Sequence, residues 1–254
     1  MNGQGETYSK SVKKALDILN CFTEKQPIGI TEISEKLGLY KSNVHTIVRT
    51  LVANNYLEQD KDSEKYYLGI SVLHLSRAVG DRYSIKNVAR PYLNELANAI
   101  GERVYLYVPI QNQIYTLYIA TPVQDRYNRP SATEGYICRM HCTGAGKAML
   151  AYMSHSEVEQ YISTGLEKYT ERTITNKEQL YSALEQIRAQ GWAEDNMEWE
   201  IGIRCLSVPV ISRTGEVLGA VSVSGPSIAV ADETRRTFLR SKLQDCVSSI
   251  KAMV

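Results

Sequence analysis

Polar and basic side chains are concentrated between Lys41 and Leu57, a stretch that contains no acidic residue. The side chains that share one side of a helical pattern there are Lys41, Ser42, Asn43, His45, Thr46 and Arg49. Asparagine and arginine can pair with base edges, whereas lysine and hydroxyl groups more often bind the phosphates that fix the register. We interpret these residues as a surface that contacts double-stranded DNA.

A second group of reactive side chains lies in the segment CRMHCTGAGKAML, residues 138–150. The types that bind zinc are Cys138, His141, Cys142 and the distant Cys205, but C-x2-H-C is a weak spacing and the chain has no CxxC. His141 and Cys142 could form a nucleophilic pair, although adjacent residues seldom point at each other. The run Gly144 to Lys147 lacks the first Gly and the final Ser or Thr of a phosphate-binding loop, which excludes that class of NTPase. We expect no metal, no cofactor and no enzyme.

Small hydroxyl and thiol side chains alternate along two predicted strands near the C-terminus. In CLSVPVIS, Cys205 and Ser207 face away from Leu206, Val208 and Val210; in EVLGAVSVSG, Ala220, Ser222 and Ser224 face away from Val217, Val221 and Val223. Such a face either contacts water or lines a cavity. Backbone N–H groups at Gly144 and Ala145, at the start of a predicted helix, favour a ligand with an anionic group such as a carboxylate.

The DNA-contacting residues require a helix-turn-helix to position them. Ile33 and Leu37 predict the inner face of a short helix, and Gly38 predicts the turn after it. A second helix follows, because its apolar residues Val44, Ile47, Val48, Leu51 and Val52 recur at helical spacing. The next segment, YLEQDKDSEKYYLG, predicts a hairpin wing whose Lys61 and Lys65 can meet phosphates. The first domain is therefore a winged helix, preceded by a helix over 11–22 with Ser9 or Ser11 as its N-cap.

The remaining elements predict an α+β domain. Residues 70–100 are a mostly helical connector with a break near 81–84, and RVYLYVPIQNQIYTLYIA is a hairpin with its turn at residues 111–113. A loop covers about 122–136, and helices are expected at 144–153, 157–162, after Asn176 until Gly191, and from Asp232 to about Lys251. The two hydroxyl-bearing strands lie between the last two helices. The result is a sheet covered by helices.

Composition supports an intracellular protein. The net charge is +1, so any attraction to DNA must come from where the charges lie. The five cysteines are mostly far apart, which suits a reducing compartment. The N-terminus has no apolar core of a signal peptide, and no apolar run is long enough to span a bilayer. We expect a cytoplasmic protein with no membrane partner.

Along nearly its whole length the chain resembles the IclR family of bacterial transcriptional regulators. The resemblance rests on the helix-turn-helix with its YYLG wing, on HCTGAGKAMLA, on GWAEDNMEWEIGIRCLSVPV and on AVSVSGP, in the family's order. It implies a winged helix-turn-helix domain over 1–69, a linker helix over 70–83 and a GAF-like effector-binding domain with an antiparallel sheet over 84–254. It also implies a homodimer or a dimer-of-dimers tetramer on a pseudo-palindromic operator.

The resemblance places the family's small-acid pocket on Gly144, Ala145, Asp195, Cys205, Ser222 and Ser224. Asp195 is added by the resemblance alone. Arg139 stands where the family usually has Pro, and Cys138 stands where an aliphatic residue is common; an arginine near the pocket would favour a carboxylate or phosphate.

The function expected from the sequence is a ligand-responsive DNA-binding regulator, acting as a repressor, whose effector is a small organic acid. The alternative is a thiol-based redox or covalent sensor, or an enzyme, that uses Cys142 or Cys205. A third interpretation, a winged helix used for protein contacts, is disfavoured by the absence of acidic residues from Lys41 to Leu57.

Overall fold

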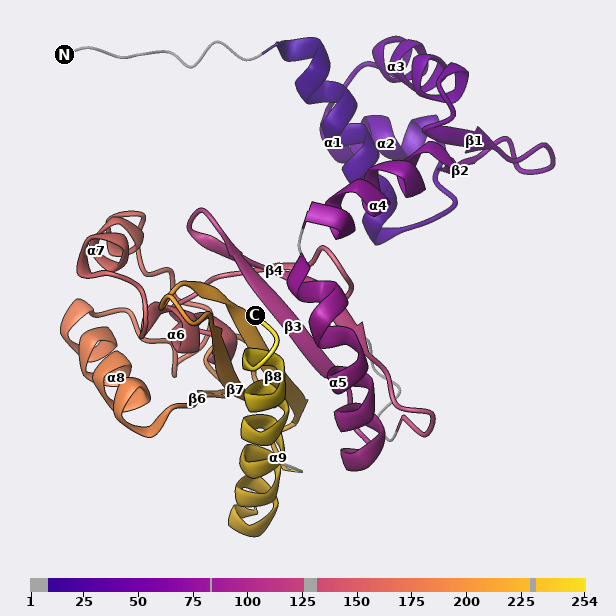
Figure 1. The fold of residues 1–254 in the computed structure, drawn as a ribbon. Coiled ribbons are helices and arrows are strands. Elements are labelled where there is room, and N and C mark those ends of the chain that lie inside the picture. Colours follow the sequence, from indigo (N-terminus) through magenta and orange to yellow (C-terminus); the bar gives the residue numbers. More distant parts are fainter. Residues whose placement is uncertain (1–8, 83, 126–131, 229–231) are drawn as a thin grey trace, which may run out of the picture. The chain divides into compact units, whose positions relative to one another are not determined.

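The structure is a computed structural model that describes residues 9–82, 84–125, 132–228 and 232–254 (Figure 1). It divides into two compact units, Met1–Arg82 and Tyr83–Val254. The first unit contains the elements α1 (Lys10–Glu24), α2 (Ile30–Leu37), α3 (Lys41–Ala53), β1 (Leu57–Gln59), β2 (Tyr66–Leu68) and α4 (Ser71–Arg82). The predicted helix-turn-helix and its hairpin are therefore confirmed, and Ser9 is the N-cap of α1.

The core of the first unit explains why these helices form. Phe22 of α1, Ile33 of α2, and Val44 and Val48 of α3 are almost completely buried and pack into one cluster. Gly38 closes α2 with a φ of 62°, a left-handed conformation that glycine adopts without strain. The turn it makes allows α3 to begin three residues later, with its apolar side held inward.

The second unit is built on a six-stranded antiparallel sheet in the order β5-β4-β3-β8-β7-β6. Its strands are β3 (Val104–Ile110), β4 (Gln113–Ala120), β5 (Ile137–Cys138), β6 (Ala193–Asn196), β7 (Ile203–Ile211) and β8 (Val217–Pro226). Its helices are α5 (Ser84–Ile100), α6 (Gly144–Leu150), α7 (His155–Ser163), α8 (Lys177–Gln190) and α9 (Glu233–Lys251). None of the described helices combines the length and apolar character needed to cross a membrane.

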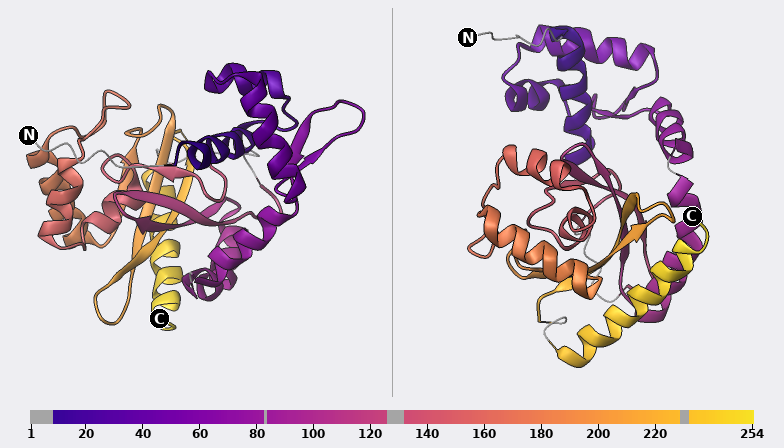
Figure 2. Two further views of the ribbon diagram at one scale, coloured as in Figure 1. Left: turned by 90° about the horizontal axis from the view of Figure 1, so that it is seen from above. Right: turned by 60° about the vertical axis from the view of Figure 1, so that its left-hand side comes forward.

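Helices cover both faces of this sheet (Figure 2). On one face, α5 and α9 pack over the apolar side of β3, β7 and β8, with Leu93, Leu106, Val208 and Leu243 in the core. On the other face, α6, α7 and α8 build a second core over residues such as Ala220. The small side chains of β7 and β8 face this second layer, where α6 approaches the sheet.

The structure corrects three details of the predicted second domain. A β-bulge between Val210 and Ile211 shifts the register, so that Val217 packs on the face opposite to Val221. The turn between β3 and β4 is shorter than expected, because Gln113 already belongs to β4. The short edge strands β5 and β6 were missed, since two and four residues are too few to show a period. The predicted loop over 122–136 includes residues 126–131, which lie outside the described residues.

Candidate functional site

The polar face predicted on the second helix of the motif lies on the outside of α3. The exposed side chains are those of Lys41, Ser42, Asn43, His45, Thr46 and Arg49, whereas Val44 and Val48 on the other face are fully buried. The Thr46 hydroxyl donates to the Ser42 carbonyl at 3.0 Å, which leaves its oxygen as an acceptor. One continuous helix face can therefore offer a guanidinium, an amide, an imidazole and an ammonium group to a partner.

One exposed residue beside this face was missed. Tyr40 is the N-cap residue of α3, and 82% of it is exposed. A large aromatic side chain left in solvent next to a polar helix face can stack on a sugar or cover a phosphate. Its position directly before Lys41 was the available signal.

The two lysines of the wing that were predicted to meet phosphates have different surroundings. Lys61 is exposed in the turn between β1 and β2, which the Asp60 carboxylate organises by accepting from the backbone of Ser63 at 2.7 Å. Lys65 instead donates to Glu32 of α2 at 2.9 Å. This ion pair ties the wing to α2, so a phosphate contact by Lys65 would require the pair to open.

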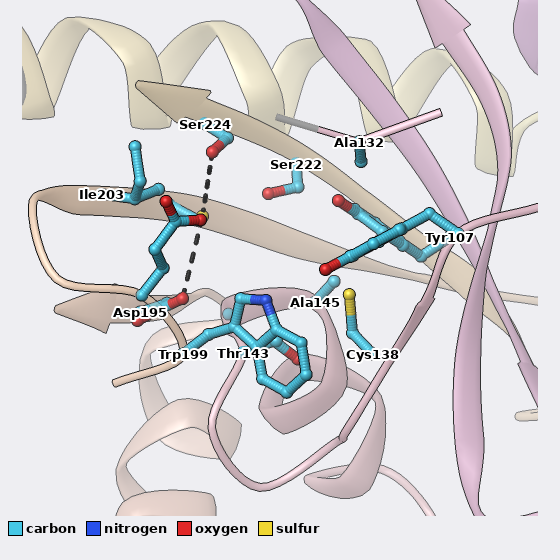
Figure 3. A pocket seen from close by; sticks show the side chains of 14 residues that line it. Tyr107, Ala132, Cys138, Thr143, Ala145, Asp195, Trp199, Ile203, Ser222 and Ser224 are labelled. Carbon is cyan, nitrogen blue, oxygen red and sulfur yellow. Dashed lines mark hydrogen bonds between the residues drawn. The ribbon is translucent and has the colours of Figure 1, made fainter. Parts of the chain in front are cut away.

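A pocket opens on the α6 side of the six-stranded sheet (Figure 3). Its polar edge is set by strand register: Asp195 of β6 lies opposite Cys205 of β7, which lies opposite Ser224 of β8. The Cys205 thiol lies 3.2 Å from the Ser224 hydroxyl and 3.9 Å from an Asp195 oxygen. Ser222, further along β8, accepts from Ser207 at 2.8 Å and donates to the Leu206 carbonyl at 3.2 Å.

The start of α6 forms the side of the pocket that faces the sheet. The Thr143 hydroxyl caps this helix by accepting from Gly146 N–H at 3.2 Å. A Cβ on Gly144 would lie 2.7 Å from the Ser207 hydroxyl and 3.2 Å from the Asp195 nitrogen, so only glycine allows this approach. Close packing of the helix start on β6 and β7 thus explains Gly144, whereas Gly146 is required by its approach to the backbone of Met140.

A tight turn after β6 supplies another wall. Trp199 and Glu200 line the pocket from this turn, in which Met197 adopts a φ of 64°, and Ile203 lines it from the start of β7. Two threonines hold the turn: Thr170 donates to the Met197 carbonyl and Thr173 to the Glu198 carbonyl, both at 2.7 Å. The turn is therefore fixed by hydrogen bonds to its backbone.

Buried charges lie directly behind the pocket. Lys147 of α6 and Glu198 are both almost fully buried, and the ammonium lies 2.5 and 2.6 Å from the two carboxylate oxygens. Asp195 is 2% exposed and accepts from the Glu198 N–H at 2.7 Å. The pKa of Asp195 is raised to about 7, mainly by burial; the Glu198 N–H and the Lys147 ammonium oppose this shift, and the Glu198 carboxylate adds to it.

Most of the sequence-predicted effector residues meet at this pocket. It is lined by Cys138, Gly144, Ala145, Asp195, Cys205, Ser222 and Ser224. Arg139 does not line it among the described residues; its guanidinium turns to Tyr169 and lies 3.7 Å from Glu167. The departure has a physical reason: successive side chains of an extended segment point to opposite sides, so Arg139 points away from the pocket that the preceding Cys138 faces.

Several lining residues were not predicted. They are Tyr107, Ala132, Tyr136, Thr143, Trp199, Glu200 and Ile203. Tyr107 lies on β3, the neighbour of β8, and could have been found only from the strand order. Trp199 and Glu200 lie in an irregular turn, where no period indicates which side chains face inward.

His141, Cys138 and Cys142, the side chains considered for a metal site or a nucleophilic pair, are engaged or buried in other ways. Both His141 ring nitrogens are occupied, at 2.6 Å from the Tyr161 hydroxyl and 2.9 Å from the Glu167 carbonyl. Burial raises the pKa of the Cys142 thiol, and it raises the pKa of the Cys138 thiol to about 12. Burial thus disfavours the thiolate form that binds metals and acts as a nucleophile. In the part of the chain that the structure describes, no three His, Cys, Asp or Glu side chains form a group able to hold a metal ion.

Comparison with known proteins assigns both units. The model of the IclR helix-turn-helix domain matches residues 11–61, and that of the bacterial transcriptional regulator IclR C-terminal domain matches residues 77–252. The chain belongs to the IclR family. It is thus a DNA-binding transcriptional regulator with a C-terminal effector domain, of the α+β class expected from the sequence.

Relatives and solved structures agree with this family. The HTH-type transcriptional regulator KdgR of Escherichia coli (strain K12) is 32% identical over 232 residues, covering 90% of this chain and 87% of KdgR. The crystal structure of Thermotoga maritima IclR matches with a TM-score of 0.81 at 26% identity, covering 97% of this chain and 99% of that one.

A solved IclR homolog is bound to a small molecule. This protein, from Microbacterium hydrocarbonoxydans, is complexed with 4-hydroxybenzoate; it matches with a TM-score of 0.80, covering 96% of this chain and 98% of its own. Because its identity to this chain is only 20%, the likeness shows the fold alone.

Proposed function

We propose that this IclR-family protein is a repressor whose operator binding changes when a small organic acid occupies the pocket beside Asp195. The observation that carries the proposal is a hydroxyl- and thiol-lined pocket enclosed by β6, β7, β8 and α6. A surface-exposed polar helix face on α3 supports the output side of the same proposal. Repression is the simpler output, because a protein that occupies a promoter can block transcription without any contact to polymerase.

The DNA contacts in this proposal come from α3 and the wing. The base-reading candidates are Asn43 and Arg49, and the phosphate-binding candidates are Lys41, Ser42, Thr46 and Lys61, with His45 between them. Lys65 takes part only if its ion pair with Glu32 opens.

The proposal includes a domain organisation and a location. Residues 70–83 are a linker between a DNA-binding domain over 1–69 and an effector-binding domain over 84–254. The protein acts in the cytoplasm, where bacterial DNA lies.

The protein binds DNA as a homodimer or as a dimer of dimers in this proposal. Three apolar residues of α4 are exposed, with Leu73 at 63%, Leu75 at 55% and Val79 at 51%. Apolar side chains on one helix left in water favour contact with a second copy. A two-fold pair of α3 helices would match a pseudo-palindromic operator.

The direct test is DNA capture followed by challenge with acids. Genomic fragments selected by the purified protein define its operator, and small monocarboxylic, sugar and aromatic acids are then added to the complex. At least one acid is expected to change protection of the operator. Binding of DNA with no response to any metabolite would remove the effector role, whereas failure to select DNA would remove the regulatory one.

Replacing Ser222 by valine is expected to abolish the effector response while leaving operator binding unchanged. Ser222 is 2% exposed and lines the pocket, so the branched side chain would occupy ligand space. Ser207→Ala is the matched control, because it removes the donor to Ser222 without adding volume to the pocket. Operator protection with and without acid measures both variants; a normal response in Ser222→Val would remove this strand face from the site.

The thiol-sensor alternative makes a different prediction. Burial raises the pKa of both Cys142 and Cys205, so both are expected to stay protonated and to react slowly with iodoacetamide at pH 7.5 in the native protein. Mass spectrometry before and after unfolding in guanidinium measures this difference. Rapid alkylation of Cys205 in the native protein would favour a covalent or redox sensor.

A further inference from the structure

The pocket has an unusual charge balance for a protein expected to sense an acid. Its described lining contains two carboxyl groups, Asp195 and Glu200, and no lysine, arginine or histidine. Glu200 is exposed and can be solvated, but Asp195 is buried. An anionic ligand would therefore enter a space where the nearest ionisable side chain is itself an acid.

Two cations near the pocket, Lys147 and Arg139, are already engaged. Lys147 binds both carboxylate oxygens of Glu198, so its charge is compensated within the protein. Arg139 points toward Glu167 and Tyr169 on the other side of its segment. Neither group is in a position to neutralise a carboxylate beside Asp195.

Titratable groups from several elements surround Asp195, and Tyr107 of β3 and Tyr136 line the same pocket. Cys205 faces it from β7, Cys138 from β5, and Lys147 and Cys142 from the segment around α6, while Glu198 and Glu200 belong to the turn after β6. The pKa values of the three thiols are all raised by burial, so they are neutral near pH 7. The carboxyl groups beside a ligand are thus Asp195, which is buried, and Glu200, which is exposed to water.

We propose that the pocket takes a small monocarboxylate together with one proton from solvent, and that the ligand carboxylate and Asp195 share this proton. This inference rests on the proposed function and names the chemical class of its effector. Two carboxylates at contact distance in a buried site cannot both be ionised, so one of them holds the proton and donates it to the other. No bond other than this hydrogen bond forms, and the proton returns to solvent when the ligand leaves.

The same geometry selects against a second negative charge. The pocket is small, with a volume of about 40 Å³, so it fits an acid of few heavy atoms. Ser224 accepts the Cys205 thiol hydrogen, and its own hydroxyl hydrogen can be donated to the ligand. One shared proton and neutral donors can hold one carboxylate, whereas a dianion would leave a charge uncompensated next to Asp195.

Calorimetric titration of the full chain with acetate, glycolate and oxamate tests this inference. Titrations at pH 8 in two buffers of different ionisation enthalpy count the protons, and about one is expected to be taken up per bound acid. Burial raises the pKa of Asp195 to about 7, so above that pH each bound acid has to bring in one proton, and the dissociation constant is expected to rise about tenfold per pH unit from pH 8 to 9. Oxalate, which carries a second carboxylate in place of the oxamate amide, is expected to bind at least about tenfold more weakly.

Two variants identify which carboxyl group of the pocket shares the proton with the ligand. Asp195→Asn is expected to bind the same acids without proton uptake and with no pH dependence, and its amide oxygen can still accept from the Glu198 N–H. Glu200→Gln removes the other lining carboxyl group and is expected to keep the parent's pH dependence. If Asp195→Asn does not fold, the parent protein still tests the inference. The number of protons taken up per bound acid and the comparison of oxalate with oxamate need no substitution.

The outcomes separate this inference from the proposed function. Binding of an acid with no proton uptake, equal affinity for oxalate and oxamate, or no binding of any of these acids overturns the shared proton. The proposed regulatory function survives each of these results if some other metabolite changes operator protection. It fails only if the protein does not bind DNA or no metabolite alters that binding.

Discussion

Replacing Lys147 by methionine is expected to destabilise the C-terminal unit by about 3–5 kcal/mol. The substitution keeps the approximate length of the side chain but removes the ammonium that contacts both oxygens of Glu198. The side chains of Lys147 and Glu198 are only 6% and 9% exposed, so water cannot replace the lost partner. The cost arises because an unpaired carboxylate stays buried behind the pocket.

Chemical denaturation followed by tryptophan fluorescence measures this change, because both tryptophans, Trp192 and Trp199, lie in the second unit. Lys177→Met is the matched control: it breaks an ion pair with Glu159 in which the lysine side chain is 48% exposed, and exposed pairs contribute about 0–1 kcal/mol. The double variant Lys147→Met with Glu198→Gln should recover part of the loss, since no unpaired charge remains. Equal effects of Lys147→Met and Lys177→Met would show that the buried pair is not a major source of stability.

The same pair is expected to influence the pocket. Glu198 lies in the turn that carries Trp199, and its N–H binds the carboxylate of Asp195. Lys147 lies on α6, whose first residues line the pocket. The two walls of the site are thus joined by one buried ion pair, so folded Lys147→Met should also bind acids more weakly.

The parts of the molecule that could be predicted from sequence are those with a period. The burial of Val44 and Val48 follows from helical spacing, and the same spacing places Arg49 on the exposed side of the helix. The strand alternation placed Ser222 and Ser224 on one face in the same way. Regular elements repeat their geometry, so which residues face inward can be read without knowing the neighbours.

The remaining parts depend on contacts between distant segments. Asp195 lies in a strand of four residues, and only its register with Cys205 brings it to the pocket. Trp199 lines the pocket because the threonine hydrogen bonds hold an irregular turn there. Arg139 illustrates the reverse: the family resemblance suggested a position near the pocket, but its side chain turns to Glu167. Side-chain direction in short or irregular segments is set by tertiary packing, which a single sequence does not display.

Replacing Arg49 by alanine is expected to weaken operator binding by roughly 2–6 kcal/mol, because each base contact contributes about 1–3 kcal/mol and a dimer loses two. Arg49 is exposed on α3 and is the only arginine on the helix, so the fold of the unit is expected to stay intact. If it reads a base, the loss will be much larger for the operator than for random DNA; if it binds a phosphate, both complexes will weaken alike and the salt dependence will become shallower.

Fluorescence anisotropy with labelled operator and with random DNA, at several salt concentrations, separates these two roles of Arg49. Arg172→Ala is the matched control, since Arg172 is also an exposed arginine but lies in the second unit. The control removes the same charge from the whole protein, so any difference between the two variants reports the position of the charge and not its loss. The α3 helix has no acidic residue to repel DNA, so Arg49 is one of several favourable contacts on that face. The full loss of operator affinity is expected only when both half-sites of the operator are bound. Equal operator affinities of the two variants at one salt concentration would mean that Arg49 does not contact DNA.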